Sequence, residues 1–307
     1  MKQLAPIIYF AFNRPIHTRK TLEALSNDKL AQQSALWIFV DGPKENATQT
    51  QKDKIAEVIN VVNEKKWCKA VNIIISPINK GLIKSITDGV TKIVNQYGKV
   101  IVMEDDILVS PGFLTYMNDA LNFYESNSRV MHISGFSRLE FQDLPINQST
   151  YFFYHTTCWG WATWKRAWDL NIMDPQILQK KLKQHGNIYQ LNMHGTYEFY
   201  WGLKSITNGK FQSWNYCWHA SVFLNNGLCL HPSKSLVANI GLDGSGTNCA
   251  SIDDIKNLST LELQVDITPI PLENNKVVLN YNRKLFSVKN KIIFTLKHYL
   301  RYIVNTQ

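Results

Sequence analysis

The sequence predicts an α/β fold in which a mainly parallel sheet carries helices on both faces. Short apolar runs alternate with amphipathic segments through the first third of the chain. Polar residues follow several of the apolar runs at the point where each ends. The composition, 45% hydrophobic and 19% charged over 307 residues, is that of a globular chain long enough to bury a large core. Alternation of strand and helix over this length is typical of a parallel sheet.

The elements follow one another in a regular order. Apolar runs predict strands, and segments with apolar residues three and four positions apart predict helices, as at Ile55, Val58, Ile59 and Val62. The predicted strands cover residues 6–12, 36–40, 71–75 and 100–103, and the predicted helices cover residues 16–26, 51–64 and 83–95. Ligands of such sheets bind beyond the carboxyl ends of the strands, so the residues there are the first candidates for a site.

The charge of the chain is concentrated at its end. Residues 276–307 hold seven basic residues and no acidic ones, whereas the rest carries 26 basic and 24 acidic residues. A nearly neutral body argues against a general nucleic-acid-binding protein.

The cysteines and the apolar runs indicate in which compartment of the cell the protein is expected. The five cysteines are widely spaced with no CxxC pair, which argues against a zinc site or a disulfide framework and favours the reducing cytoplasm. The longest N-terminal apolar run is interrupted by Asn13-Arg14-Pro15, and no stretch approaches the roughly 18 apolar residues of a membrane span. We therefore expect a cytoplasmic protein without a span.

Three consecutive carboxylates, Glu104, Asp105 and Asp106, come directly after the strand predicted at residues 100–103. Their mutual repulsion is unfavourable unless a cation is present. Oxygen ligands suit Mg²⁺ or Mn²⁺, which proteins hold through one or two carboxylates together with substrate phosphates. The alternative is an acidic surface turn, which the preceding strand disfavours.

Other polar residues stand at neighbouring strand ends. Asp41 could accept hydrogen bonds from a base or ribose, or could form a turn in Asp-Gly-Pro. Asn13 and Arg14 could reach a base or pyrophosphate, or could close the end of the first strand. Lys84 could pair with a phosphate, or could be a solvated lysine on a helix.

An ordered set of motifs resembles a bacterial family of GT-A glycosyltransferases. The family is related to the large family-2 group and, through the EDD segment, to N-acetylglucosaminyltransferase I. The motifs are AFNRP, FVDGP, NKGLIKSITDGV, VIVMEDD, HISGF, WGWATWKRAW and NIGLDGSGTN, and the resemblance covers about residues 5–250. It implies one GT-A domain over residues 1–250, with a nucleotide-sugar-binding half over 1–107 and an acceptor-binding half over 108–250.

The resemblance also implies a role for individual residues. Asp106 would be the direct ligand of a Mn²⁺ or Mg²⁺ ion that bridges the donor diphosphate. Glu104 and Asp105 would face the ribose and the donor sugar, and Asp41 would read the nucleobase. The residues near uridine or diphosphate would be Asn13, Arg14 and Lys84.

The segment CWGWATWKRAW is the second feature. Trp161, Trp164 and Trp168 recur at helical spacing, which predicts core packing under a helix. Aromatic faces also suit sugar rings, and in resembling enzymes this element lines the donor-sugar and acceptor pocket. We expect Trp159, Gly160 and Trp161 in the pocket, with Trp164 and Trp168 in the core.

The catalytic base is the weakest point of the pattern. Gln212 and Asn215 stand where related enzymes carry an acidic residue, and neither can take a proton. The remaining candidates are Glu198 and Asp243, whose alternatives are a solvated helix residue and a turn former. His219 and His231 are expected to be structural.

The resemblance therefore predicts a metal-dependent, inverting glycosyltransferase. It would move a sugar from a UDP-linked donor to a hydroxyl of a glycan acceptor, lipid-linked or free, in bacterial surface polysaccharide synthesis. A sugar-nucleotide pyrophosphorylase is disfavoured because the segment after the first strand, FNRPIHTRKTL, lacks glycine. The alternative is a non-catalytic sugar-nucleotide or glycan-binding protein that keeps the GT-A fold.

The C-terminal segment reads as a linker over 251–275 and a basic amphipathic tail over 276–307. Apolar residues between 283 and 303 recur at spacings of three and four and are interrupted by lysine and arginine. This pattern is typical of a helix lying on an anionic membrane, here the inner face of the cell membrane, with residues 277–307 as the contact. The alternative is that the apolar stripe packs against the body of the protein.

Overall fold

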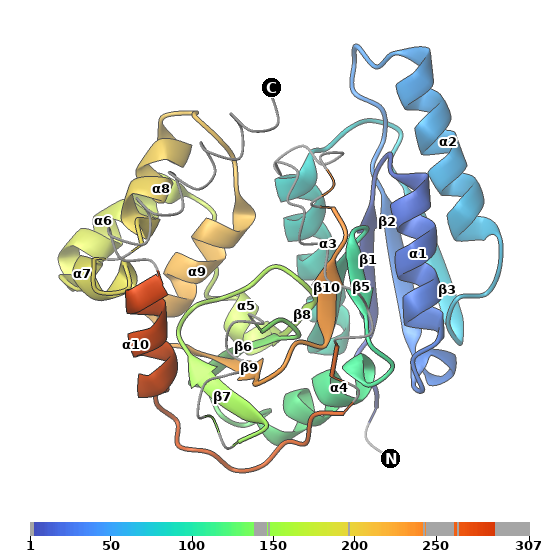
Figure 1. Ribbon diagram of the computed structural model, residues 1–307. Coiled ribbons are helices and arrows are strands. Elements are labelled where there is room, and N and C mark those ends of the chain that lie inside the picture. Colours follow the sequence, from blue (N-terminus) through green and yellow to red (C-terminus); the bar gives the residue numbers. More distant parts are fainter. Residues whose placement is uncertain are drawn as a thin grey trace, which may run out of the picture.

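The computed structural model describes residues 3–137, 146, 148–195, 197–241, 243, 261–262 and 264–285. The elements are labelled in Figure 1. The strands are β1 (Ile7–Ala11), β2 (Ala35–Val40), β3 (Ala70–Ile75), β4 (Lys99–Glu104), β5 (Ile107–Val109), β6 (Val130–Ser134), β7 (Thr150–Phe153), β8 (Trp161–Trp164), β9 (Leu228–Pro232) and β10 (Val237–Asn239). The helices are α1 (Pro15–Ser26), the 3₁₀ turn η1 (Ala31–Gln33), α2 (Gln49–Asn63), α3 (Leu82–Tyr97), α4 (Phe113–Phe123), α5 (Lys165–Trp168), α6 (Pro175–His185), α7 (Ile188–Leu191), α8 (Phe199–Thr207), α9 (Trp214–Leu224) and α10 (Lys276–Leu285).

One eight-stranded sheet runs through the molecule in the order β3-β2-β1-β4-β8-β6-β9-β7. The strands β3, β2, β1 and β4 are parallel, β8 is antiparallel to both β4 and β6, and β9 is again parallel to β6. Helices pack on both faces, so the predicted α/β class is confirmed. Because β4 pairs with β8, the sheet joins the two sequence halves without a break.

The four predicted strands and three predicted helices of the first third are confirmed, each to within a few residues. Their ends have local causes. Thr48 and Gln51 form a capping box at the start of α2, and Gly81 and Gly98, both with φ of 77°, bound α3. A left-handed backbone at those two positions is one that glycine adopts without strain.

The tryptophan segment differs from the helix expected for it. Trp161 and Trp164 lie on strand β8, and only Trp168 lies on a helix, α5. Residues three apart on a strand point to opposite faces, so Trp161 joins the core on one face of the sheet and Trp164 the core on the other. The strand is buried on both faces because β8 lies in the middle of the sheet, and a doubly buried strand shows no alternation of polar and apolar residues.

Each face of the sheet has its own apolar core. Residues of α1, α2 and α4 pack on one face, for example Leu22, Val58 and Leu114. Residues of α3 and α9 pack on the other, for example Val90 and Trp218. The sheet is therefore covered by apolar packing on both faces.

A third core lies within a group of helices at the side of the sheet. Figure 1 shows α6, α7, α8 and α9 gathered there, with α10 against them. Val278 of α10 is fully buried in this core, and Asn275 N–H donates to the Phe152 carbonyl at 2.8 Å. Within the expected linker, Val265 and Leu272 pack on the sheet core. The described parts of the linker and of the basic tail are therefore attached to the body.

Residues 286–307 of the predicted amphipathic tail lie outside the described part of the chain. Among the described residues, no helix is both long and apolar enough to cross a bilayer.

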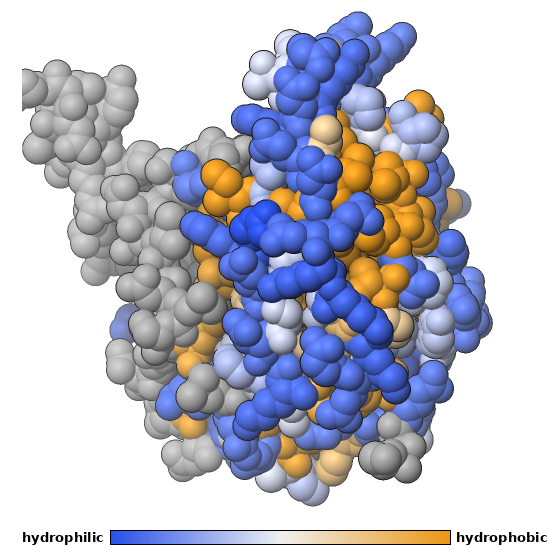
Figure 2. All heavy atoms as spheres, turned by 90° about the vertical axis from the view of Figure 1, so that its right-hand side faces the viewer, coloured by the Kyte–Doolittle hydropathy of each residue, from blue (hydrophilic) through white to orange (hydrophobic). Residues whose placement is uncertain are grey.

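Strand β3 forms one edge of the sheet, and its outer side is partly apolar. Figure 2 looks onto this side of the molecule and shows an apolar area among hydrophilic side chains. Ile75, which ends β3, is 47% exposed, and Ile78 and Leu82, which follow it in the chain, are 66% and 46% exposed. Single-sided pairing of an apolar edge strand leaves its outer backbone groups open to solvent.

Candidate functional site

The candidate site forms where the neighbouring parallel strands β1 and β4 end. Phe10 of β1 is in register with Glu104 of β4, so the residues that follow the two strands meet. Arg14 comes from the first strand end, and both of its terminal nitrogens lie 3.2 Å from Oδ2 of Asp106. Its Nη1 also lies 3.7 Å from Oδ1 of Asp105. The structure thus brings together two of the carboxylates and the arginine that the sequence singled out.

A segment distant in the sequence, β10 and the residues after it, packs beside the carboxylates. Strand β10 pairs antiparallel with β5, directly after the carboxylates, and Ile240 N–H donates to the Asp106 carbonyl at 2.8 Å. Nε2 of His17, on α1, lies 3.3 Å from the Ile240 carbonyl oxygen and 3.1 Å from Oδ2 of Asp243. His17 therefore attaches the 239–243 segment to α1 beside the carboxylates.

Gly241 lies directly against Asp106 and Arg14. A Cβ at this position would lie 2.5 Å from Nη2 of Arg14 and closer still to Oδ2 of Asp106. Any side chain here would displace one of the two charged groups, so the close approach of the segment requires glycine. The motif NIGLDGSGTN contains Gly241, but no sequence pattern had indicated a role for Gly241 or for His17.

The carboxyl groups of the site have less positive charge near them than their ionised forms require. Burial raises the pKa of Asp105 to about 7, which Arg14 partly offsets and Asp106 increases. Burial also raises the pKa of Glu104 well above its usual range, and the charges of Asp106 and Asp105 raise it further. Burial likewise raises the pKa of Asp106, against the opposing effect of Arg14. One arginine does not compensate three adjacent carboxyl groups, of which Asp105 is buried and the other two half-buried, and additional cationic charge would stabilise their ionised forms.

These residues fit a divalent cation of the Mg²⁺ or Mn²⁺ kind. Among the described residues, no three histidine, cysteine or acidic side chains surround a common point, so a fully protein-made cage is not present there. Mg²⁺ and similar ions do not need one, because they keep several waters and take one or two carboxylates plus substrate phosphates. Asp106, at 17% side-chain exposure against 12% for Asp105, is the more exposed of the two carboxylates that Arg14 contacts.

Asp41 is engaged by the backbone of the next loop. Its Oδ1 accepts from Lys80 N–H at 2.8 Å and from Gly42 N–H at 3.0 Å, and its Oδ2 accepts from Gly81 N–H at 3.0 Å. The carboxylate therefore connects the end of β2 to the start of α3. Its expected contact with a nucleobase stays a prediction.

The other predicted donor-binding residues lie near the strand ends without contacts to the carboxylates among the described interactions. Asn13 is half-buried, next to Arg14. Lys84, on the first turn of α3, forms an exposed ion pair with Asp88 at 3.0 Å. Their roles toward uridine or diphosphate stay predictions.

The three residues expected in the sugar pocket do not all lie in the same surroundings. Trp159 is half-buried and packs edge-on against Phe136, with ring centroids 4.5 Å apart. Gly160 has φ of 58° and its carbonyl accepts from Gly135 N–H at 2.7 Å. Trp161 is fully buried between His132 and other rings of the core, so its expected place in the pocket is wrong. A side chain enclosed on every side has no face to offer a sugar.

Two tryptophans lie where they were expected. Trp164 and Trp168 are 3% and 5% exposed, and each belongs to one of the two sheet cores. Their placement in the core is confirmed.

The two base candidates differ in their relation to the site. The Asp243 side chain is 35% exposed and lies beside His17, and its charge acts on Asp106. Glu198 is exposed at the start of α8, and among the described contacts none joins its carboxylate to the site. Asn215, where a carboxylate was sought, accepts a hydrogen bond from Thr156 Oγ1 at 3.1 Å. Of the two candidates for the catalytic base, Asp243 is therefore the one that lies beside the carboxylates.

The buried histidines are parts of the packing. His231 Nε2 lies 2.9 Å from the His155 carbonyl oxygen, and burial lowers its pKa to about 4. Burial lowers the pKa of His219 to about 3, and neither of its ring nitrogens has a partner among the described residues. Phe199 packs on the His219 ring at 4.1 Å between centroids. Both imidazoles are neutral near pH 7.

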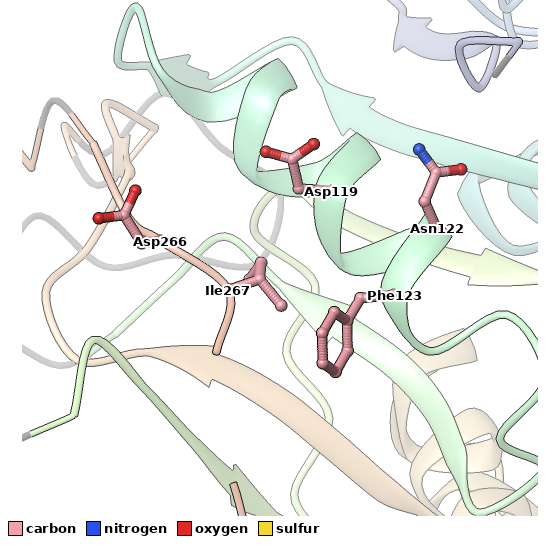
Figure 3. Close-up of a pocket in the computed structure, with 5 residues that line it drawn as sticks. All are labelled: Asp119, Asn122, Phe123, Asp266 and Ile267. Carbon is pink, nitrogen blue, oxygen red and sulfur yellow. The ribbon is translucent and has the colours of Figure 1, made fainter. Parts of the chain in front are cut away.

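A cavity of about 460 Å³ lies elsewhere, between the end of α4 and the 266–267 segment. Figure 3 shows Asp119 and Asp266 on its two sides. Asn122, in its wall, accepts from Lys99 Nζ at 2.8 Å. Lys99 begins β4 and Glu104 ends it, so this cavity lies at the opposite end of that strand from the carboxylates.

Comparisons with known proteins complete the description. No family model matches the chain, and no curated protein matches it. Among solved structures, TarS of S. aureus aligns with a TM-score of 0.35 and 13% identity over 57% of this chain and 31% of TarS. Glucosyl-3-phosphoglycerate synthase from Mycobacterium tuberculosis, solved with Mn²⁺ and UDP, aligns at 0.32 and 10% over 54% and 58%. A UDP-glucose pyrophosphorylase aligns at 0.39 and 8% over 77% and 93%.

The chain spans about a third of the length of TarS and somewhat more than half of the synthase.

Proposed function

We propose that the protein is a metal-dependent glycosyltransferase that takes a sugar from a UDP-linked donor and transfers it to a hydroxyl of a glycan. The observation that carries this proposal is the group Arg14, Asp105 and Asp106 at the carboxyl ends of adjacent parallel strands, closed by the segment around Gly241. Sheets of this kind bind nucleotides at that edge. The motif order of the sequence supports the same function, including the setting of bacterial surface polysaccharide synthesis.

The chemistry requires stabilisation of negative charge on the departing nucleoside diphosphate. A divalent cation held by Asp106 would neutralise part of that charge in the transition state. Asp105, whose carboxylate also accepts from the backbone N–H of Phe12, would orient the donor. The Arg14 guanidinium would bind diphosphate oxygens through its planar set of donors.

The acceptor must lose a proton as the new bond forms. We assign this step to the Asp243 carboxylate, which is partly exposed and is oriented by its contact with His17. A carboxylate on the acceptor side can take the hydroxyl proton, as inverting transfer needs.

The decisive experiment is release of UDP from a panel of UDP-sugars in the presence of Mn²⁺, with wild-type protein and with Asp106→Asn. We expect the substitution to reduce release by about 10²-fold or more, because it removes the charged ligand of the cation. Asp169→Asn is the matched control, since Asp169 is an exposed carboxylate paired only with Lys165 among the described contacts.

Two results would contradict the proposal. Equal UDP release by Asp106→Asn and wild type would exclude the metal assignment. Tight UDP binding by the wild type without turnover across a broad acceptor panel would instead support the non-catalytic sugar-nucleotide-binding protein.

A further inference from the structure

We propose that Arg14 is the resident counter-cation of the carboxylates, and that it leaves this position to a divalent cation only when a diphosphate is present to receive its guanidinium. The inference rests on the proposed function and deepens it. It predicts that metal and nucleotide do not bind independently but are coupled through one side chain.

Arg14 already occupies an oxygen of Asp106. Both terminal nitrogens of Arg14 approach the same oxygen, Oδ2 of Asp106, at 3.2 Å. The Asp106 side chain is only 17% exposed, so little of its carboxylate remains open to another cation. A Mg²⁺-like ion on a carboxylate oxygen sits about 2.1 Å away. A guanidinium and a divalent ion on that one oxygen would be close enough to repel each other strongly.

Within the described part of the chain, Arg14 also has an unsatisfied hydrogen-bond donor. Nε of Arg14 is buried, and no acceptor reaches it among the described residues. A buried N–H without a partner is unfavourable, and arginine has a further donor to offer to an incoming anion. Diphosphate oxygens match that requirement, since the guanidinium donates to phosphate through several N–H groups at once.

Arg14 stands at the start of helix α1. It is the N-cap residue of α1, and its side chain makes no capping hydrogen bond. The N-terminal end of a helix of this length favours negative charge, so a diphosphate that draws the guanidinium away from Asp106 would itself be stabilised there. Gly241 bounds the other side of the guanidinium. The surroundings therefore give Arg14 two anionic partners, the carboxylates and a ligand.

The consequence is a defined coupling. Without nucleotide, a divalent cation must displace Arg14 and leave its charge unpaired, so it binds weakly. With a nucleoside diphosphate, Arg14 moves to the phosphates and the carboxylates become available. Because such coupling is reciprocal, the cation strengthens nucleotide binding by the same factor.

The test measures binding of Mn²⁺ alone, by the loss of the electron paramagnetic resonance signal of the free ion, in wild type and in Arg14→Met. We expect the substitution to tighten Mn²⁺ binding by about tenfold or more, within the usual range of coupling between sites. The same substitution should weaken UDP binding, measured calorimetrically with Mn²⁺ present. Arg14→Lys, which keeps the charge, should bind Mn²⁺ alone as weakly as wild type.

Arg19→Met is the matched control. Arg19 lies on the same helix, and its charge pairs with Glu64 on the outside of the molecule. It should leave both affinities unchanged. Arg14→Gln provides a second neutral variant if Arg14→Met fails to fold, as judged by thermal melting.

The outcomes separate this inference from the proposed function. If the neutral variants bind Mn²⁺ no tighter than wild type while wild type binds UDP, the coupling is refuted and the glycosyltransferase proposal stands. If the neutral variants bind Mn²⁺ more tightly but no form binds UDP or a UDP-sugar, Arg14 is the counter-cation and the proposed donor is wrong. Tighter binding by Arg19→Met as well would refute the inference, because the effect would then follow net charge alone.

Discussion

At the scale of single residues, Asp28 is a buried carboxyl group with a structural task. It is 3% exposed, and its two oxygens accept from the backbone N–H groups of Leu30 and Leu114, each at 2.9 Å. It thereby connects the turn after α1 to the start of α4. Burial raises the pKa of Asp28 to about 6, against the lowering effect of these hydrogen bonds.

This raised pKa predicts a specific dependence of stability on pH. Between about pH 4 and pH 6 the folded protein holds a proton on Asp28 that the unfolded chain has lost. Stability is therefore present at low pH and decreases as pH rises through this window. Two pH units at about 1.4 kcal/mol each correspond to about 3 kcal/mol.

The measurement compares wild type with Asp28→Asn, which resembles the protonated acid and does not titrate. Urea unfolding at about pH 4 and about pH 7.5 should show the free energy of unfolding of wild type falling by about 3 kcal/mol relative to the variant. A difference between the two proteins that stays constant across this range would show that the pKa of Asp28 is not raised.

At the scale of secondary structure, α10 shows how a polar-looking segment attaches to the body. Asn275 caps it, since Oδ1 accepts from the N–H groups of Val277 and Val278 at 3.0 and 3.1 Å. Val278 is fully buried in the core of the α6–α9 group, and Leu279 and Tyr281 pack against that core, whereas Val277 is 36% exposed. The cap positions the helix, and the burial of Val278, together with the packing of Leu279 and Tyr281, attaches it to the body.

We expect Val278→Asp to detach α10, because burying an unpaired carboxylate is strongly unfavourable. The variant should lose at least about 2 kcal/mol of stability, and limited proteolysis should cut near residue 275 first. Val277→Asp on the same helix should have little effect. Equal protease resistance of the two variants would show that α10 contributes no packing.

At the scale of the whole molecule, the net charge of +9 resides mainly in the C-terminal residues. The described start of that segment, α10, belongs to the folded body. The predicted membrane contact would therefore rest on residues 286–307, whose sequence carries Lys289, Lys291, Lys297 and Arg301. A truncation that tests the membrane contact should therefore begin at residue 286 and not at residue 277, the start expected from the sequence.

We expect deletion of residues 286–307 to keep the melting temperature and to abolish sedimentation with phosphatidylserine vesicles. Each basic residue near an anionic surface contributes about 1 kcal/mol, so four correspond to about 4 kcal/mol, or roughly a thousandfold in binding. Neutral vesicles are the control for the full chain. Undiminished sedimentation of the truncated protein would refute the membrane contact.

The sequence by itself determined the alternation of strands and helices up to β4 and the position of the acidic motif after it. Those features are local, because periodicity and turn residues act over a few neighbouring positions. It also indicated Asp105, Asp106 and Arg14 as candidates, since the ends of parallel strands share one edge of a sheet.

The tertiary structure decided how those residues meet. Arg14 and Asp106 are 92 positions apart, and His17 lies 223 positions from the Ile240 carbonyl that it contacts. The insertion of β8 between β4 and β6 placed Trp161 in the core, although its spacing from Trp164 and Trp168 had indicated a helix. No local pattern reports such pairings, because they depend on which strands become neighbours when the whole core is packed.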